Sequence, residues 1–131
     1  MSKLSTNLQS GKFTITCELN PPKGINLEKL FKKADMLKER VVAINITDSA
    51  GSNMTMAPIA VSHLLHHRGI EPILQITGRD RNRIAIQADL IAASTLGITN
   101  ILTMSGDPPK HGDHPEAKPV FDLNSTEVLD A

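Results

Sequence analysis

The stretch EPILQITGRDRNRIAIQADLIAASTLG, residues 71–97, decides the fold of this chain. Residues 71–78 are rich in Ile, Leu and Thr and end in glycine, which is typical of a strand. From residue 79 onward, apolar residues recur at helical spacing, and Gly97 follows at a position that suits a helix stop. The stretch therefore predicts one strand followed by one helix.

The same strand–helix unit is predicted along the rest of the chain. Further strands are expected over 13–19, 41–47 and 100–107, and further helices over 27–40, over 55–68 and from Asn124 or Ser125 onward. The predicted strand ends are spaced by 29, 28 and 32 residues, at Glu18, Thr47, Gln75 and Asp107. This order indicates parallel strands joined by helical crossovers.

Length and composition predict one soluble domain. The chain has 131 residues, which suits a single domain; residues 1–12 are expected to be a polar lead-in and residues 13–131 the domain. Lys and Arg together number 14, Asp and Glu also number 14, and aromatic residues make up 2%. This balance argues against a nucleic-acid-binding protein. No apolar run suits a membrane span or a secretory signal, and the single Cys17 favours a reducing cytoplasm.

Polar residues alternate with apolar residues along each predicted strand. Because successive side chains point to opposite faces of a strand, each strand is expected to have one polar face. These polar faces are predicted to hold Thr14, Thr16 and Glu18, then Asn45 and Thr47, then Gln75 and Thr77, and finally Thr103, Ser105 and Asp107. Buried polar groups without partners cost about 1–3 kcal/mol each. The four rows favour a polar cavity or a bound ligand, and the alternative is that these residues satisfy one another or solvent in an open sheet.

The predicted fold class is α/β, specifically half of a (β/α)8 barrel. In such a barrel the C-terminal ends of the strands build the active site, and Glu18 would lie on that rim and face inward. A complete barrel takes about 250 residues, so this chain supplies about four βα units. Half a barrel leaves two strand edges unpaired. The chain is therefore expected to be a fragment, a truncated chain or half of an assembly.

Four segments together resemble the methylenetetrahydrofolate reductase family. They are ELNPPKG (18–24), INITDSA (44–50), EPILQITGRDRNR with QADLIAASTLGITNIL (71–102) and MSGDPPKHGDHPEAKPVFDL (104–123). A lone GDPP motif would be weak, whereas four segments at matching strand positions are specific. The resemblance covers roughly residues 13–131 and corresponds to the N-terminal half of the family's catalytic barrel.

The resemblance implies a flavin-dependent reductase. Such an enzyme passes a hydride from NADH or NADPH through FAD, rather than FMN, to 5,10-methylenetetrahydrofolate and releases 5-methyltetrahydrofolate. By the same resemblance Glu18 is the general acid that protonates N10 of the folate, and Asp107 lies near both flavin and pterin. The flavin contacts that it implies are Thr47, Gln75 and Asp107, together with the backbone of Ser105 and Gly106. At positions 75 and 105 some members have His and Arg.

The two carboxylates also have simpler interpretations. A carboxyl group in a partly dry pocket can keep its proton near neutral pH, which suits Glu18 as an acid. The alternative is an ordinary carboxylate in solvent at a strand end. For Asp107 the alternative is a turn residue that precedes Pro108.

No metal site is predicted. His63, His66 and His67 have helical spacing but lack a second group of ligands, so a solvated helix face is expected. His111 and His114 are expected in a loop that shapes the flavin pocket. The segment RDRNR, residues 79–83, is either an anion site at a helix N-terminus or a charged first turn capped by Asp80. The sequence leaves both interpretations open.

Two classes of function remain. The first is a folate reductase, whole or partial, that works with a folate, a pyridine nucleotide and a second copy of itself as partners. The second is a non-catalytic half-barrel, a scaffold or partner subunit that keeps the family sequence without its reaction. Retention of Glu18 and Asp107 favours the first class.

Overall fold

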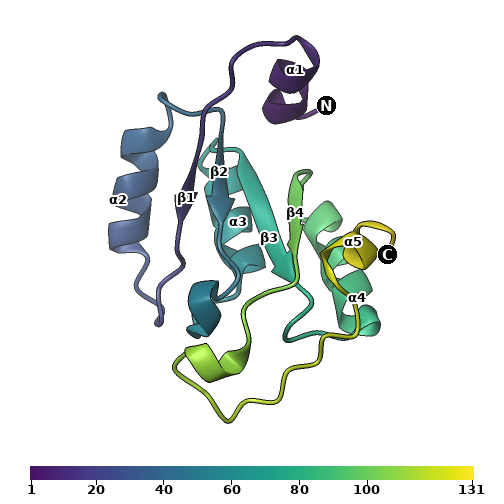
Figure 1. The fold of residues 1–131 in the computed structure, drawn as a ribbon. Helices are drawn as coiled ribbons and strands as arrows, with labels where there is room; N and C mark the ends of the chain where they lie inside the picture. The colour runs from purple at the N-terminus through teal and green to yellow at the C-terminus, as the bar shows by residue number, and fades with distance from the viewer.

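Four parallel strands form one sheet in the order β1-β2-β3-β4 in the computed structural model, which describes residues 1–131 (Figure 1). The strands are β1 (Thr16–Leu19), β2 (Ala43–Ile46), β3 (Pro72–Thr77) and β4 (Ile101–Met104). The helices are α1 (Lys3–Gln9), α2 (Glu28–Leu37), α3 (Pro58–His67), α4 (Arg83–Thr95) and α5 (Ser125–Leu129), and two short 3-10 helices are η1 (Ala50–Ser52) and η2 (Pro109–His111). The predicted α/β order with parallel strands is confirmed. Closure into an eight-stranded barrel stays a prediction.

Helices α2, α3, α4 and α5 cover one face of the sheet. The largest core cluster packs Leu30 and Ala34 of α2 and Val61 and Leu65 of α3 against the sheet, where they meet Leu19, Ile44 and Ile46. Two smaller clusters join α3, α4 and α5 to β3, through Leu74 and Ile76. These contacts remove the apolar side chains of the three clusters from water. The other face of the sheet has no helix over it.

The uncovered face differs from the prediction in the fourth strand. Gln75 pairs in register with Leu102, and Thr77 pairs with Met104, so Leu102 and Met104 share the face of Gln75. Ile101, one residue earlier, packs into the core clusters on the helix side. The prediction that Thr103 and Ser105 continue the polar face was therefore wrong, whereas Asp107 lies beyond the end of β4. The predicted alternation was right, but the face that the helices cover was assigned wrongly, because Leu102 and Met104 are apolar yet lie on the uncovered face.

The first strand and the N-terminus also differ from expectation. β1 begins at Thr16 rather than at residue 13, and the side chain of Phe13 is 92% exposed. Residues 3–9, expected as part of a polar lead-in, form helix α1, which Ser2 caps by accepting from the backbone N–H of Ser5. Figure 1 shows α1 at the N-terminal end of the strands.

Helix ends follow ordinary capping chemistry. The side chain of Asn82, not of Asp80, caps α4 by accepting from the backbone N–H of Ala85. Asn124 caps α5, and Glu127 completes a reciprocal capping box, which confirms the expected start of the last helix. Gly97 ends α4 with φ of 80°, a conformation that other residues rarely adopt.

None of the helices combines the length and apolar character that crossing a membrane requires.

One buried hydroxyl in the core yields a stability prediction. Ser62 on α3 is fully buried, and its Oγ has no hydrogen-bond partner. A buried polar group without a partner is costly. Ser62→Ala is therefore expected to raise the free energy of unfolding by about 1 kcal/mol, measured by urea unfolding. Ser94→Ala on the exposed side of α4 gains the same helix propensity without relieving a buried group, so a gain no larger than that of this control would contradict the prediction.

Candidate functional site

A cavity of about 450 Å³ opens on the uncovered face, at the C-terminal ends of the strands. Its volume lies within the range of small-molecule sites. Five of the six residues predicted from the sequence line it, and the sixth, Ser105, does not. Its lining includes Glu18, Thr47, Asp48, Gln75, Thr77, Arg79, Gly106 and Asp107. Residues that are far apart in the sequence thus meet where parallel α/β folds place their ligands.

Glu18 and Gln75 form a hydrogen-bonded pair across the cavity. Nε2 of Gln75 donates to Oε2 of Glu18 over 3.2 Å. Gln75 is buried, whereas Glu18 is exposed on the open face of the sheet. The expected partly dry pocket around Glu18 is therefore not formed by these four strands alone. Gln75 holds the carboxylate in place and leaves its second oxygen free.

Thr47 lies at the end of β2 and is 1% exposed. Its hydroxyl donates to Oδ1 of Asn20 over 2.8 Å, which ties the loop after β1 to the end of β2. Asn45, two residues earlier, donates through Nδ2 to the carbonyl of Cys17 over 3.3 Å. Side-chain hydrogen bonds therefore join β1 to β2 in addition to the backbone hydrogen bonds between the two strands.

The segment after β4 places its three predicted residues differently. Oγ of Ser105 accepts from the backbone N–H of Ser125 over 3.2 Å, at the start of α5. Gly106 has φ of 91°, and a Cβ there would lie 2.9 Å from Cβ of Arg79. Only glycine fits this position, so its backbone lies directly against the cavity wall. Asp107 follows on the rim with its side chain exposed.

Asp48 is a buried carboxylate that was not among the residues predicted for the site. It is 4% exposed, and its Oδ2 accepts from both the backbone N–H and the hydroxyl of Thr77, over 2.9 and 3.0 Å. The guanidinium of Arg81 donates to the same oxygen over 2.6 Å and, through Nε, to Asp89 over 2.8 Å. Burial lowers the pKa of Arg81, but the hydrogen bonds and charges of Asp48 and Asp89 outweigh it and raise that pKa above its usual value. The position of Asp48, one residue after the predicted strand end at Thr47, is the feature of the sequence that could have identified it as a site residue.

Arg79 holds the loop after β2. Arg79 is only 3% exposed. Its Nη1 donates to the carbonyl of Ser49 over 3.3 Å and to Oγ of Ser52 over 3.1 Å. The hydrogen bonds that Arg79 donates to Asp80 raise the pKa of Arg79, so the guanidinium stays charged. Ser49 and Ser52 have left-handed backbones, with φ of 49° and 60°, which is unfavourable for residues other than glycine. Oγ of Ser52 in turn donates to the carbonyl of Asp107 over 2.6 Å.

These contacts decide the interpretation of RDRNR. Arg79 pairs with Asp80, Arg81 with Asp48 and Asp89, and Arg83 with Asp122. Each arginine is thus already paired with a carboxylate of the chain. The segment serves as an ion-pair network rather than as an open anion site.

The outer loop of the rim carries a short ion pair. Nζ of Lys23 lies 2.6 Å from Oδ2 of Asp113, whose Oδ1 accepts from the backbone N–H of Met54. The hydrogen bond from Lys23 and then that from Met54 lower the pKa of Asp113 to about 2. The loops after β1, β2 and β4 therefore meet at this carboxylate.

The histidines do not form a metal centre. No group of three or more His, Cys, Asp or Glu side chains is arranged to hold a metal ion. The rings of His63 and His67 meet edge to face at 4.4 Å on α3, and His66 and His67 are exposed.

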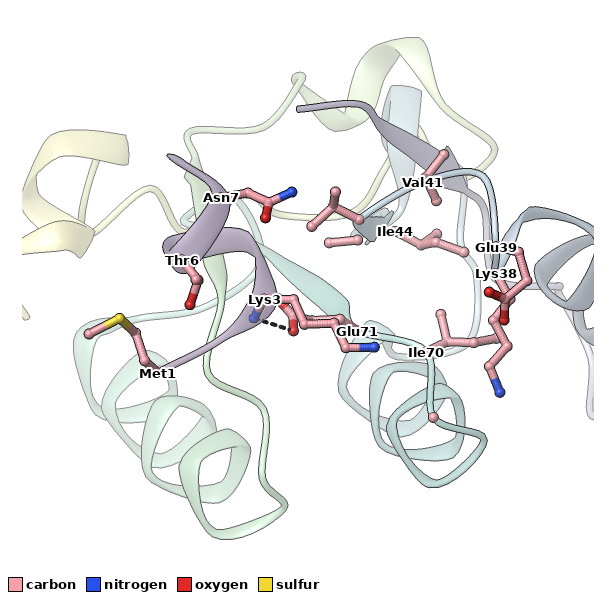
Figure 2. A pocket seen from close by; sticks show the side chains of 13 residues that line it. Met1, Lys3, Thr6, Asn7, Lys38, Glu39, Val41, Ile44, Ile70 and Glu71 are labelled. Atoms are coloured by element: carbon pink, nitrogen blue, oxygen red, sulfur yellow. Dashed lines mark hydrogen bonds between the residues drawn. The ribbon is translucent and has the colours of Figure 1, made fainter. Parts of the chain in front are cut away.

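A second cavity, of about 440 Å³, lies at the opposite end of the sheet and is shown in Figure 2. It lies between α1 and the segments that lead into β2 and β3, and contains none of the predicted site residues. Glu71 accepts from the backbone N–H groups of Lys3 and Leu4 over 2.7 and 2.8 Å. This end of the sheet therefore anchors α1, in keeping with the structural role of the N-terminal face in barrels.

Comparison with known proteins agrees with this arrangement. Residues 3–129 match the family described as "Methylenetetrahydrofolate reductase". "Methylenetetrahydrofolate reductase 2" of Schizosaccharomyces pombe is 29% identical over 119 residues, which are 88% of this chain. The match spans 19% of the length of that relative. Since the family match extends over nearly the whole chain, the chain belongs to the methylenetetrahydrofolate reductase family.

Proposed function

We propose that this chain forms the first half of a flavin-dependent reductase barrel that converts 5,10-methylenetetrahydrofolate to 5-methyltetrahydrofolate. The observation that carries the proposal is the Glu18–Gln75 pair, which shares one cavity with Thr47, Gly106 and Asp107. Family membership makes folate the substrate class that this constellation fits best.

The cavity residues fit a flavin. Gln75 offers an amide, and Gly106 offers backbone that no Cβ shields, beside Cβ and the methyl group of Thr77. Such groups suit the polar edge of an isoalloxazine ring, so Thr47, Gln75, Gly106 and Asp107 would hold FAD. The bound flavin would supply hydride transfer between NADH or NADPH and the folate.

Glu18 supplies the proton that the folate reaction requires. A protonated Glu18 donates to N10, the bond between N10 and the methylene carbon breaks, and the iminium left at N5 can accept a hydride. Gln75 fixes the carboxyl group through the 3.2 Å hydrogen bond. The exposed carboxylate of Asp107 would stabilise the cationic folate by its charge.

The proposal is tested on a complete reductase that carries this chain, through its two half-reactions under anaerobic conditions. NADH or NADPH is expected to bleach the bound flavin, and methylenetetrahydrofolate is expected to restore its colour. A flavin that the nucleotide reduces but the folate does not reoxidise would contradict the proposed substrate.

Residues 1–131 alone are expected to bind FAD weakly and to lack reductase activity, because loops from both halves of a barrel close its site.

A further inference from the structure

A chain of hydrogen bonds joins the loops after β2 and β4, and the proposed chemistry does not use it. Nη1 of Arg79 donates to Oγ of Ser52, and this hydroxyl donates to the carbonyl of Asp107 over 2.6 Å. The carbonyl of Pro108 lies 3.1 Å from the same hydroxyl. Figure 1 shows the two loops side by side, with η1 next to η2 (light green). A buried cation thus reaches the backbone of Asp107 through one serine.

The loop after β2 is held in a conformation that its residues disfavour. Ser49, Gly51 and Ser52 have left-handed backbones, with φ of 49°, 61° and 60°. For residues other than glycine this conformation is unfavourable, and it persists where surrounding contacts fix it. The guanidinium of Arg79 supplies such contacts, because it donates to the carbonyl of Ser49 as well as to Ser52. The strained loop therefore directs the hydroxyl of Ser52 toward the backbone of Asp107.

Arg79 also holds the far end of the segment that begins at Asp107. The carbonyl of Arg79 accepts from the backbone N–H of Val120 over 2.7 Å. Its side chain holds Asp107 through Ser52, so one residue fastens both ends of residues 107–120. This segment cannot shift along the rim of the cavity without breaking a contact with Arg79.

The charge of Arg79 acts on the same carboxylate. The hydrogen bonds to Asp80 raise the pKa of Arg79 most, and the charge of Asp107 adds to the rise. The guanidinium therefore attracts the carboxylate of Asp107 as well as holding its backbone. Both effects favour one position of that carboxylate on the rim.

We propose that Arg79 and Ser52 are positioning residues for the folate step, which fix Asp107 where its carboxylate stabilises the cationic folate. This role rests on the proposed function, in which the charge of Asp107 acts on the iminium. Electrostatic stabilisation of this kind depends on charges that are already in place, so a carboxylate that moves stabilises the cation less. Arg79 and Ser52 act through Asp107 and not on the reacting atoms.

Hydrogen exchange in the complete reductase tests the positioning itself and requires no folate. Ser52→Ala removes the hydroxyl that holds Asp107. The amides of residues 106–112 are expected to exchange about tenfold faster in this variant, because a hydrogen bond that fixes their backbone is lost. Asn53→Ala is the matched control, since Asn53 is exposed and donates only to carbonyls within its own loop. Exchange of residues 106–112 that is no faster in the Ser52 variant than in the control would overturn the proposal.

The folate half-reaction tests whether the position of Asp107 matters to the chemistry. Ser52→Ala is expected to slow reoxidation of the flavin at saturating folate about tenfold, because a small misplacement of a reacting group is costly. The folate concentration at half-saturation is expected to stay unchanged, since the cation forms only after folate is bound. In an Asp107→Asn background the same change is expected to slow the reaction less than about twofold, because no carboxylate remains to be positioned.

Equal losses in the two backgrounds would overturn the proposal, since they would mean that Ser52 does not act through Asp107. Failure of folate to reoxidise the flavin of the unmodified reductase would instead contradict the proposed function. Hydrogen exchange then still decides whether Ser52 holds Asp107.

Arg79→Lys tests the guanidinium. Lysine keeps the positive charge but lacks the planar fork, so it cannot donate to Asp80 and to the loop after β2 together. Exchange is expected to rise in residues 49–53 and in residues 106–112, and the folate step is expected to slow at least as much as in Ser52→Ala. Circular dichroism confirms that the variant is folded. Unchanged exchange and an unchanged rate would overturn the role of Arg79.

Discussion

Replacing Glu18 with Gln is expected to lower folate reduction at least about 100-fold, since a positioned acid typically contributes that much or more. Reduction of the bound flavin by NADH or NADPH is expected to continue, because only the folate step needs a proton at N10. Glutamine keeps the size of the side chain and an oxygen that can accept from Nε2 of Gln75. The variant therefore removes the proton and leaves the arrangement intact.

Stopped-flow measurement of each half-reaction in the complete reductase separates the two steps. Glu39→Gln is the matched control, since Glu39 lines the cavity at the opposite end of the sheet. The control is expected to match the unmodified enzyme in both steps. Folate turnover by the Glu18 variant at the control rate would show that another group supplies the proton.

Removing Asp48 is expected to cost about 3–5 kcal/mol of stability, because Asp48→Ala leaves a partly buried guanidinium without its main partner. The variant also removes the acceptor of the backbone N–H and hydroxyl of Thr77. The side chain of Arg81 is 19% exposed, so water compensates only in part. Few other single changes in this chain remove so many buried hydrogen bonds.

Urea unfolding at one fixed protein concentration measures the effect, since self-association would otherwise shift the apparent stability. Asp89→Ala is the control, because it removes the other carboxylate of Arg81, which is 41% exposed. Exposed ion pairs contribute at most about 1 kcal/mol. Equal losses in the two variants would mean that burial of the Asp48–Arg81 pair adds nothing to stability.

The sequence predicts the strand and helix order well where its periodicity is unambiguous. β3 and α4 follow directly from the pattern of residues 71–97, because a six-residue strand buried throughout and a helix with a capped start leave few alternatives. β4 was harder, because Leu102 and Met104 are apolar yet lie on the uncovered face, opposite to Ile101. Side-chain parity shows which residues share a face, but not which face the helices cover.

Polar residues at the predicted strand ends were the main signal for the candidate site, and the family resemblance added Gly106. Glu18, Thr47 and Gln75 lie at such ends and meet in one cavity. Ser105 was expected on the polar face, but its hydroxyl accepts from the backbone N–H of Ser125 at the start of α5. The expected backbone contact of Ser105 with a flavin stays a prediction. Asp48 and Arg79 escaped prediction, since their roles depend on pairing between loops that sequence spacing does not reveal.

The contacts among the loops after β2, β3 and β4, which surround the cavity, limit how the site can evolve. Arg79 holds Ser49 and Ser52, and Ser52 holds the backbone of Asp107. A Cβ on Gly112 would lie 1.8 Å from the carbonyl oxygen of Ser52, so the loops after β2 and β4 are also in direct contact. A substitution in one of these loops therefore demands a compensating substitution in another. Homologous sequences should show correlated exchange among these positions, and transplanting a new specificity into this scaffold calls for exchanging the three loops as one cassette.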